Sequence, residues 1–185
     1  MADAVTVEGI PALVVPGIGD SGPGHWQTCW ERQHLHWRRV RQRDWAHPVC
    51  DEWVAALHAA VVQASVPPLL IAHSMGCLTV VHWASRSALP VRAALLVAVP
   101  DPEAAMFPAT AKGFRPVPSA RLPWPSLLVA STDDPFGSAA FARRCAAAWG
   151  SEYVEIGAVG HINAESGVGA WPAGLALLQR LLRAT

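Results

Sequence analysis

The chain lacks the sequence features of membrane-spanning and secreted proteins. No apolar run approaches the roughly 20 residues that a membrane-spanning helix requires. The N-terminus, Met1-Ala2-Asp3-Ala4, has neither the positively charged region nor the long apolar stretch of a signal peptide. We therefore expect a cytoplasmic protein with no membrane partner.

The chain also lacks an excess of charge of either sign. It carries 14 Lys and Arg against 14 Asp and Glu, so its formal net charge is zero and gives no electrostatic reason to expect nucleic acid as a partner. Lys112 is the only lysine. We interpret this bias toward arginine as a trace of GC-rich, bacterial coding.

Metal-binding and redox motifs are absent. The four cysteines form no C-x-x-C pair and the histidines form no His-x-x-x-His pair, which argues against a zinc site and against a redox motif. We expect no metal and no cofactor, and reduced thiols in or near the core; the cysteines are Cys29, Cys50, Cys77 and Cys145.

What is present is an alternation of short apolar runs and helical patterns. At 185 residues, 52% of them hydrophobic, the chain is long enough for a single domain, residues 1–185, with a buried sheet. Strands are expected at Ala12–Val15, Trp37–Val40, Leu69–Ile71, Ala93–Val99, Leu127–Ala130 and Tyr153–Ile156. Helices are expected at Trp26–His34, Asp51–Ser65, Gly76–Ser87, Ser138–Trp149 and Ala173–Ala184.

This alternation predicts an α/β protein of three layers, with helices on both faces of a mainly parallel six-stranded sheet. Right-handed crossovers allow the strand order 2-1-3-4-5-6, and the arginines of the second strand suit an edge position. Ligands bind where such an order reverses, here beyond the carboxyl ends of strands one and three. The chain has no spare segment for a large cap, and the proline-rich stretch 100–125 is the one candidate for a rim over that point.

The segment Ala72-His73-Ser74-Met75-Gly76 directly follows the third apolar run. A sharp turn from strand to helix lifts a serine hydroxyl out of the chain toward a base, and small residues on either side of it leave room for the turn. The alternative is a serine that only caps the next helix. Residues in two later loops favour the first interpretation, a nucleophilic Ser74.

An acid and a histidine follow in the order that such a fold requires. Asp134 precedes Pro135 after the fifth strand, and His161 follows Gly160 after the sixth, giving the order nucleophile, acid, base. We prefer Asp134 as the acid because proline restrains its backbone. Asp133 is the reserve, and Asp101 is more suited to a turn.

Acyl transfer also requires backbone N–H donors for the developing oxyanion. The amide of Met75 is the natural first donor. The second is expected from the loop after strand one, from Ile18 with Gly19 as the alternative. A phosphate-binding loop is the rival interpretation of this segment, but no Gly-Lys-Ser/Thr is present.

These residues resemble the small serine hydrolases related to retinoblastoma-binding protein nine, especially the bacterial members. The matching stretches cover nearly the whole chain: Pro16-Gly17, Gly24-His25-Trp26-Gln27, Trp30-Glu31, Asp44-Trp45, Trp53, Ala72-His73-Ser74-Met75-Gly76-Cys77, Asp134-Pro135, Gly160-His161-Ile162-Asn163-Ala164-Glu165-Ser166-Gly167 and Trp171-Pro172. The resemblance implies an α/β-hydrolase without a large cap, with Ser74, Asp134 and His161 as its triad.

Beside the expected oxyanion loop, His25 and Trp26 either line an acyl pocket or start a helix with the tryptophan packed beneath it. Some of the nine tryptophans could form an aromatic wall of a cleft. Two functions remain open. The first is a serine hydrolase, carboxylesterase-like, that cleaves small ester, amide or thioester substrates. The second is a protein-binding module on the same scaffold, although the sequence indicates no protein partner.

Overall fold

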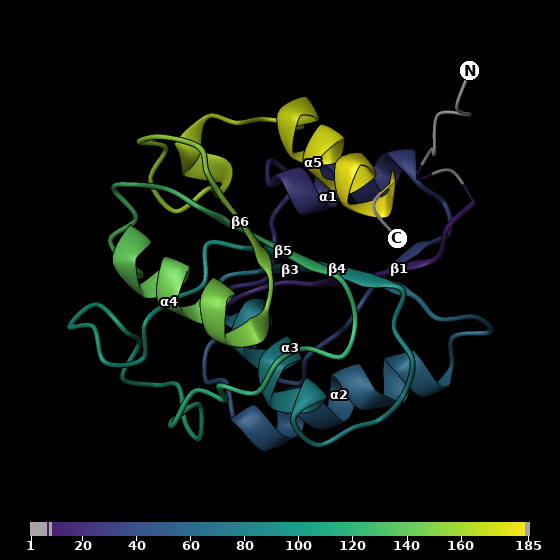
Figure 1. Cartoon of the computed structure of the whole chain (residues 1–185), viewed down its shortest axis with the longest axis horizontal. Helices are drawn as coiled ribbons and strands as arrows, with labels where there is room; N and C mark the ends of the chain where they lie inside the picture. The colour runs from purple at the N-terminus through teal and green to yellow at the C-terminus, as the bar shows by residue number, and fades with distance from the viewer. Residues whose placement is uncertain (1–6, 8, 184–185) are drawn as a thin grey trace.

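The computed structural model describes residue 7 and residues 9–183, and within them a single parallel sheet forms the centre of the molecule (Figure 1). Its strand order is β2-β1-β3-β4-β5-β6, as the sequence predicts, and each neighbouring pair is parallel. The strands are β1 (Ala12–Val15), β2 (Trp37–Arg39), β3 (Leu69–His73), β4 (Ala93–Val97), β5 (Ser126–Ala130) and β6 (Glu152–Glu155).

Helices cover both faces of the sheet, which gives the expected three layers (Figure 1). The helices are α1 (Trp26–Gln33), α2 (Cys50–Val62), α3 (Met75–Ala84), α4 (Ala139–Trp149) and α5 (Pro172–Arg183), with a short 3-10 helix, η1 (Ala164–Ser166). α1 and α5 lie on one face, and α2, α3 and α4 lie on the other. Among the described residues no inserted helical segment forms a large cap, and no helix is long and apolar enough to cross a membrane.

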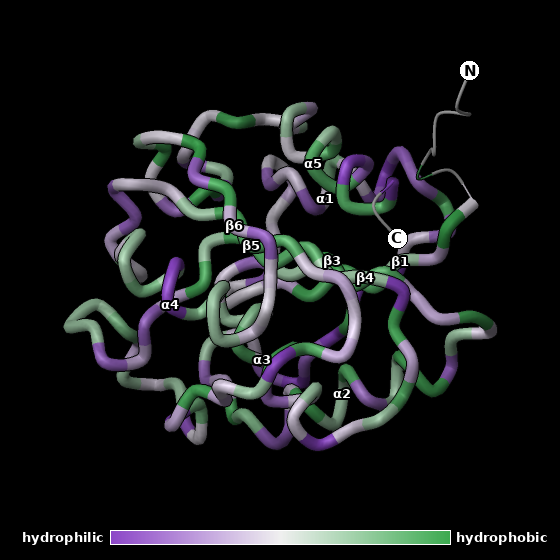
Figure 2. The backbone as a smooth tube through the Cα atoms, viewed as in Figure 1, coloured by the Kyte–Doolittle hydropathy of each residue, from purple (hydrophilic) through white to green (hydrophobic). Residues whose placement is uncertain are grey.

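The position of each strand explains its composition. The central strands β3, β4 and β5 are buried along their whole length, so both of their faces are apolar (Figure 2). The outer strands carry polar residues, with Arg38 exposed in β2 and Glu152 exposed in β6. The prediction that the arginine-bearing strand lies at an edge is therefore confirmed.

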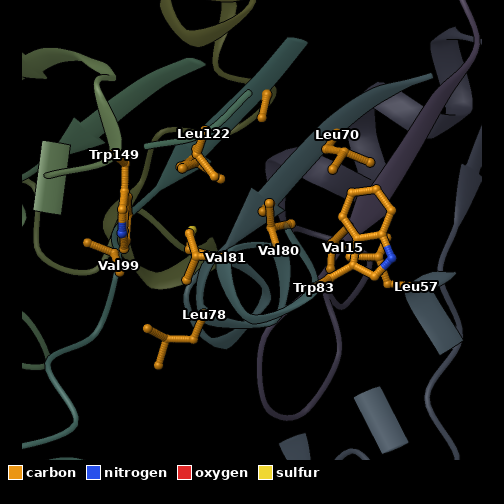
Figure 3. Close-up of a cluster of buried hydrophobic side chains, with 14 of the residues drawn as sticks. Val15, Leu57, Leu70, Leu78, Val80, Val81, Trp83, Val99, Leu122 and Trp149 are labelled. Carbon is orange, nitrogen blue, oxygen red and sulfur yellow. The ribbon is translucent and has the colours of Figure 1, made fainter. Parts of the chain in front are cut away.

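Two apolar clusters fill the space between the sheet and its helices. The cluster beneath α2, α3 and α4 includes Val15, Leu70 and Trp83 (Figure 3), and a second cluster lies beneath α1 and α5. Trp53 of α2 is only 1% exposed and belongs to the first cluster. The segment between β4 and β5 contains no helix, as its prolines predict.

Candidate active site

Ser74 makes the whole turn between β3, which ends at His73, and α3, which begins at Met75. Its backbone angles are φ 54° and ψ −125°, a conformation that L-residues rarely adopt. The Ser74 amide donates to the carbonyl of Val97 at 2.9 Å, which ties the turn to the end of β4. Such strain persists only where the surrounding structure fixes it, and it occurs often at functional sites.

Two glycines allow the chain to approach this turn. A Cβ atom on Gly76 would lie 2.0 Å from the carbonyl oxygen of Val15, and one on Gly17 would lie 2.8 Å from Cβ of Ser74. No side chain fits in either place. The end of β1 and the loop after it therefore pack directly against the serine turn.

Gly76→Ala is expected to destabilise the fold because its new methyl group meets backbone rather than a movable side chain. Overpacking usually costs about 1–3 kcal/mol, and the cost here should reach or exceed the upper end of that range. This cost is measured as the difference in the free energy of unfolding between Gly76→Ala and Gly22→Ala in denaturant. Gly22 is the matched control, since a Cβ there meets nothing within 4 Å. Equal stability of the two variants would contradict the proposed crowding.

A continuous chain of hydrogen bonds joins Ser74, His161 and Asp134. Oγ of Ser74 lies 2.8 Å from Nε2 of His161, and Nδ1 of His161 lies 2.9 Å from both carboxylate oxygens of Asp134. The Asp134 side chain is 2% exposed and that of His161 is 11% exposed. With the His161 proton on Nδ1, facing the carboxylate, Nε2 is free to accept the serine proton.

The two neighbouring carboxylates of the sequence have separate partners. Oδ1 of Asp133 accepts hydrogen bonds from the Gly160 amide and from the Ser131 hydroxyl, each at 2.7 Å. These bonds lower the pKa of Asp133. Asp133 thus fixes the loop that carries His161, and Asp134 contacts the imidazole itself. Asp101 accepts from the Glu103 amide at 2.9 Å, which is the turn role expected for it.

A cavity of about 320 Å³ opens over Ser74. Pro100 and Pro108 of the proline-rich segment line it, and so does Phe136, whose ring centroid lies 4.6 Å from that of His161. The full lining is Gly17, Ile18, Asp20, Gly22, His25, His73, Ser74, Met75, Pro100, Pro108, Phe136, His161, Asn163, Ala164 and Glu165. The expected rim is therefore present, and the walls contain no lysine or arginine.

The loop after β1 supplies one candidate oxyanion donor and removes another. Ile18 and Met75 both line the cavity, and the Met75 amide, as the first of α3, has no partner within its own helix. The Gly19 amide donates to the carbonyl of Trp45 at 3.0 Å, so it is not free to donate to an oxyanion. Ile18 is therefore the better candidate of the two that the sequence offered.

The glycines of this loop, Gly17, Gly19 and Gly22, have the G-x-G-x-x-G spacing of dinucleotide-binding loops. The geometry does not fit that use. Gly17 packs against Ser74, which occupies the space beside the loop, and α1 begins only at Trp26. In a dinucleotide site the glycines open directly into the helix whose N-terminus meets the pyrophosphate.

For His25 and Trp26 both a pocket role and a helix-start role were open, and the structure places His25 at the cavity and Trp26 beneath the start of α1. His25 lines the cavity and caps α1, with Nδ1 accepting from the Gln27 amide at 3.2 Å. Burial, followed by the nearby Arg39 charge, lowers the pKa of His25 to about 4, so its ring is neutral at pH 7.

The pocket role of Trp26 is wrong. Trp26 is fully buried, does not line the cavity, and donates from Nε1 to the carbonyl of Ile162 at 2.9 Å. The prediction that tryptophans form an aromatic wall of the cleft is also wrong, because none of the nine tryptophans lines the cavity. Most of them are core residues: Trp26, Trp30, Trp37, Trp53, Trp83, Trp124, Trp149 and Trp171 are each at most 8% exposed.

Sequence reasoning missed Arg39, the last residue of β2. Its guanidinium donates to Oδ1 of Asp20 at 2.8 Å, to the Ser21 carbonyl at 2.9 Å and to Thr28 Oγ1 at 2.6 Å, and it pairs with Glu31. Arg39 therefore ties the loop that contains Ile18 to α1 and to the sheet edge. The arginines of this strand were explained by solvent exposure alone, and nothing in their pattern distinguishes the one that is 12% exposed.

No group of histidine, cysteine, aspartate or glutamate side chains in the described part of the chain could bind a metal ion.

Comparison with known proteins identifies the family and the fold of this chain. The family model of the serine hydrolases matches residues 12–180. A YdeN-like protein of known structure from Pectobacterium atrosepticum has 35% sequence identity and a TM-score of 0.85, with 95% of this chain and 91% of that chain covered. A search of curated protein sequences gave no significant match.

More distant structures share the fold. The ydeN gene product of B. subtilis is 17% identical with a TM-score of 0.73, and the alignment covers 94% of this chain and 99% of that one. A thermophilic esterase from Thermogutta terrifontis is 15% identical with a TM-score of 0.69, with coverage of 97% and 91%. At these identities the likeness concerns the fold alone.

Proposed function

The chain belongs to the serine hydrolase family, and from that premise we propose that it cleaves small esters, and related amides or thioesters, through an acyl-enzyme formed on Ser74. The observation that carries this proposal is the hydrogen-bonded chain from Ser74 through His161 to Asp134. It supplies a nucleophile, a general base and an orienting carboxylate in one line at the floor of a cavity.

The reaction follows from these positions. Oγ of Ser74 bonds to the acyl carbon while its proton moves to Nε2 of His161, and the resulting imidazolium faces the Asp134 carboxylate. The amides of Met75 and Ile18 donate to the oxyanion. His161 then returns the proton to the leaving group as the acyl bond breaks. Water attacks the acyl-enzyme, again giving its proton to His161, and the acid leaves as Ser74 recovers the proton.

The cavity sets the expected substrate size. Its volume of about 320 Å³ lies at the small end of ligand sites, and residues 9–183 form no large cap that could add a longer acyl tunnel. On p-nitrophenyl esters, kcat/KM is expected to be highest for acetate and butyrate and to fall by at least about tenfold at octanoate, a difference of about 1.4 kcal/mol. A steady rise with acyl length, as in a lipase, would contradict this preference.

Labelling with a fluorophosphonate probe tests the reaction class independently of the substrate. The probe requires an activated serine, so labelling of the folded wild-type protein supports the proposal. A folded protein that neither reacts with the probe nor hydrolyses any of the esters would overturn the proposed function and favour the protein-binding alternative.

We also propose, from the stretches around His25 and His161, that the chain is a bacterial member of the subfamily related to retinoblastoma-binding protein nine.

A cytoplasmic location and a single domain over residues 1–185 are further proposals. The four cysteines are free, as expected in a reducing compartment, and three of them, Cys50, Cys77 and Cys145, are buried. Cell fractionation tests the location, and a single cooperative unfolding transition would agree with one domain.

A further inference from the structure

The loop that carries His161 is held in an unfavourable backbone conformation. Gly160 and Ile162, on either side of His161, have φ values of 58° and 49°. For a β-branched residue such as Ile162 a positive φ is a genuine outlier. A loop of this kind relaxes unless several contacts fix it.

Contacts from two other parts of the chain, the loop after β5 and helix α1, fix the neighbours of His161. The Val159 amide donates to Oγ of Ser131, the Gly160 amide donates to Asp133, and the Ile162 carbonyl accepts from Trp26. None of these bonds is made by the backbone of His161 itself. Its carbonyl accepts from Nε2 of His73 at 2.9 Å.

His73 is the residue immediately before Ser74, so this hydrogen bond completes a closed ring of contacts among His73, Ser74 and His161. The nucleophile is joined covalently to His73, His73 donates to the His161 backbone, and Nε2 of His161 lies 2.8 Å from Ser74 Oγ. We propose that His73 is a positioning residue, whose Nε2–H fixes the backbone of His161 and so keeps the imidazole within reach of the Ser74 hydroxyl. This inference rests on the proposed function.

The surroundings of His73 suit that role. His73 is 5% exposed, and its ring packs edge-on against that of His25, with centroids 4.7 Å apart, and is tilted against that of His161, with centroids 4.9 Å apart. These contacts fix its rotamer. A carbonyl only accepts, so Nε2 carries the proton. Burial, with His161 and His25 nearby, holds the pKa of His73 well below its usual value, so it adds no positive charge beside the His161 imidazolium.

The test compares His73→Phe, which keeps an aromatic ring and removes the donor, with His73→Gln, whose amide nitrogen can replace Nε2. His82→Phe is the matched control: His82 is 4% exposed and its Nε2 lies 3.2 Å from the Phe114 carbonyl, on the far part of α3. We expect kcat on p-nitrophenyl acetate to fall about 10- to 100-fold in His73→Phe with KM within about twofold, because small misplacements of reacting groups cost this much. His73→Gln should recover most of the loss.

His82→Phe should lose stability without losing kcat per folded molecule. A His73→Phe enzyme that retains kcat, or that changes only KM, would overturn the proposal. So would equal losses of kcat in His73→Phe and His82→Phe, since burial alone would then explain both.

A second measurement tests the positioning role of His73 without measuring turnover. NMR of ¹⁵N-histidine-labelled protein reports the Nδ1 proton that His161 shares with Asp134. This signal should shift or broaden in His73→Phe and stay in place in His82→Phe, and an unchanged signal in both would overturn the positioning role. If the wild type lacks activity and probe labelling while this NMR difference is found, the proposed function fails and the positioning role stands.

Discussion

Ser74→Ala is expected to abolish hydrolysis of p-nitrophenyl acetate, with a fall in kcat on the order of 10⁶-fold, as when the nucleophile of other serine hydrolases is removed. Labelling by the fluorophosphonate probe should disappear with it. The loss follows because alanine has no atom at the position that lies 2.8 Å from Nε2 of His161. Steady-state kinetics and gel-based labelling measure the two effects.

The fold should survive this substitution. Alanine keeps the Cβ atom and therefore keeps the strain of the positive φ at position 74, so the free energy of unfolding should change by less than about 1 kcal/mol. Ser85→Ala, at the other end of α3, is the control and should remain active. Residual turnover or labelling in folded Ser74→Ala would show that another residue is the nucleophile.

Asp134→Asn is expected to lower kcat by about 10⁴-fold with little change in KM. An asparagine amide facing Nδ1 of His161 favours the wrong tautomer, which leaves Nε2 protonated and unable to accept from Ser74. The substitution is nearly isosteric, and its remaining oxygen can still accept from the Phe136 amide, as Oδ1 of Asp134 does at 2.9 Å. The effect is therefore on the base rather than on the loop, and kcat at pH 7 to 8 measures it.

The adjacent Asp133→Asn provides a matched comparison. Oδ1 of Asp133 only accepts hydrogen bonds, from Gly160 and Ser131, and an asparagine oxygen can accept the same two bonds. Its kcat should fall by less than about tenfold. A larger loss in Asp133→Asn than in Asp134→Asn would reverse the assignment of the acid.

The sequence alone predicted the strands and helices to within a few residues and the order of the sheet. These features depend on apolar periodicity and on chain connectivity, which are local or topological properties. The same holds for the candidates Ser74, Asp134 and His161, because each follows a strand in the chain order that this fold requires. Their hydrogen bonds to one another are seen only in the folded chain.

The tertiary structure decided what each neighbouring residue contacts. In the structure Asp134 contacts His161, whereas Asp133 accepts a hydrogen bond from the Gly160 amide. His25 lies at the cavity and Trp26 is buried beneath it, and the Gly19 amide donates to the carbonyl of Trp45. Adjacent residues in a loop have the same sequence context but point in different directions, and no periodicity encodes those directions.

Long-range contacts were equally outside the reach of sequence reasoning. Arg39 ties down the loop of Ile18 from the sheet edge, and His73 reaches the backbone of His161, 88 positions later in the chain. The sequence thus determined which elements form and where along the chain a nucleophile, an acid and a base can lie. Only packing determined which side chains meet, because a hydrogen bond depends on distances of about 3 Å between segments that the fold alone brings together.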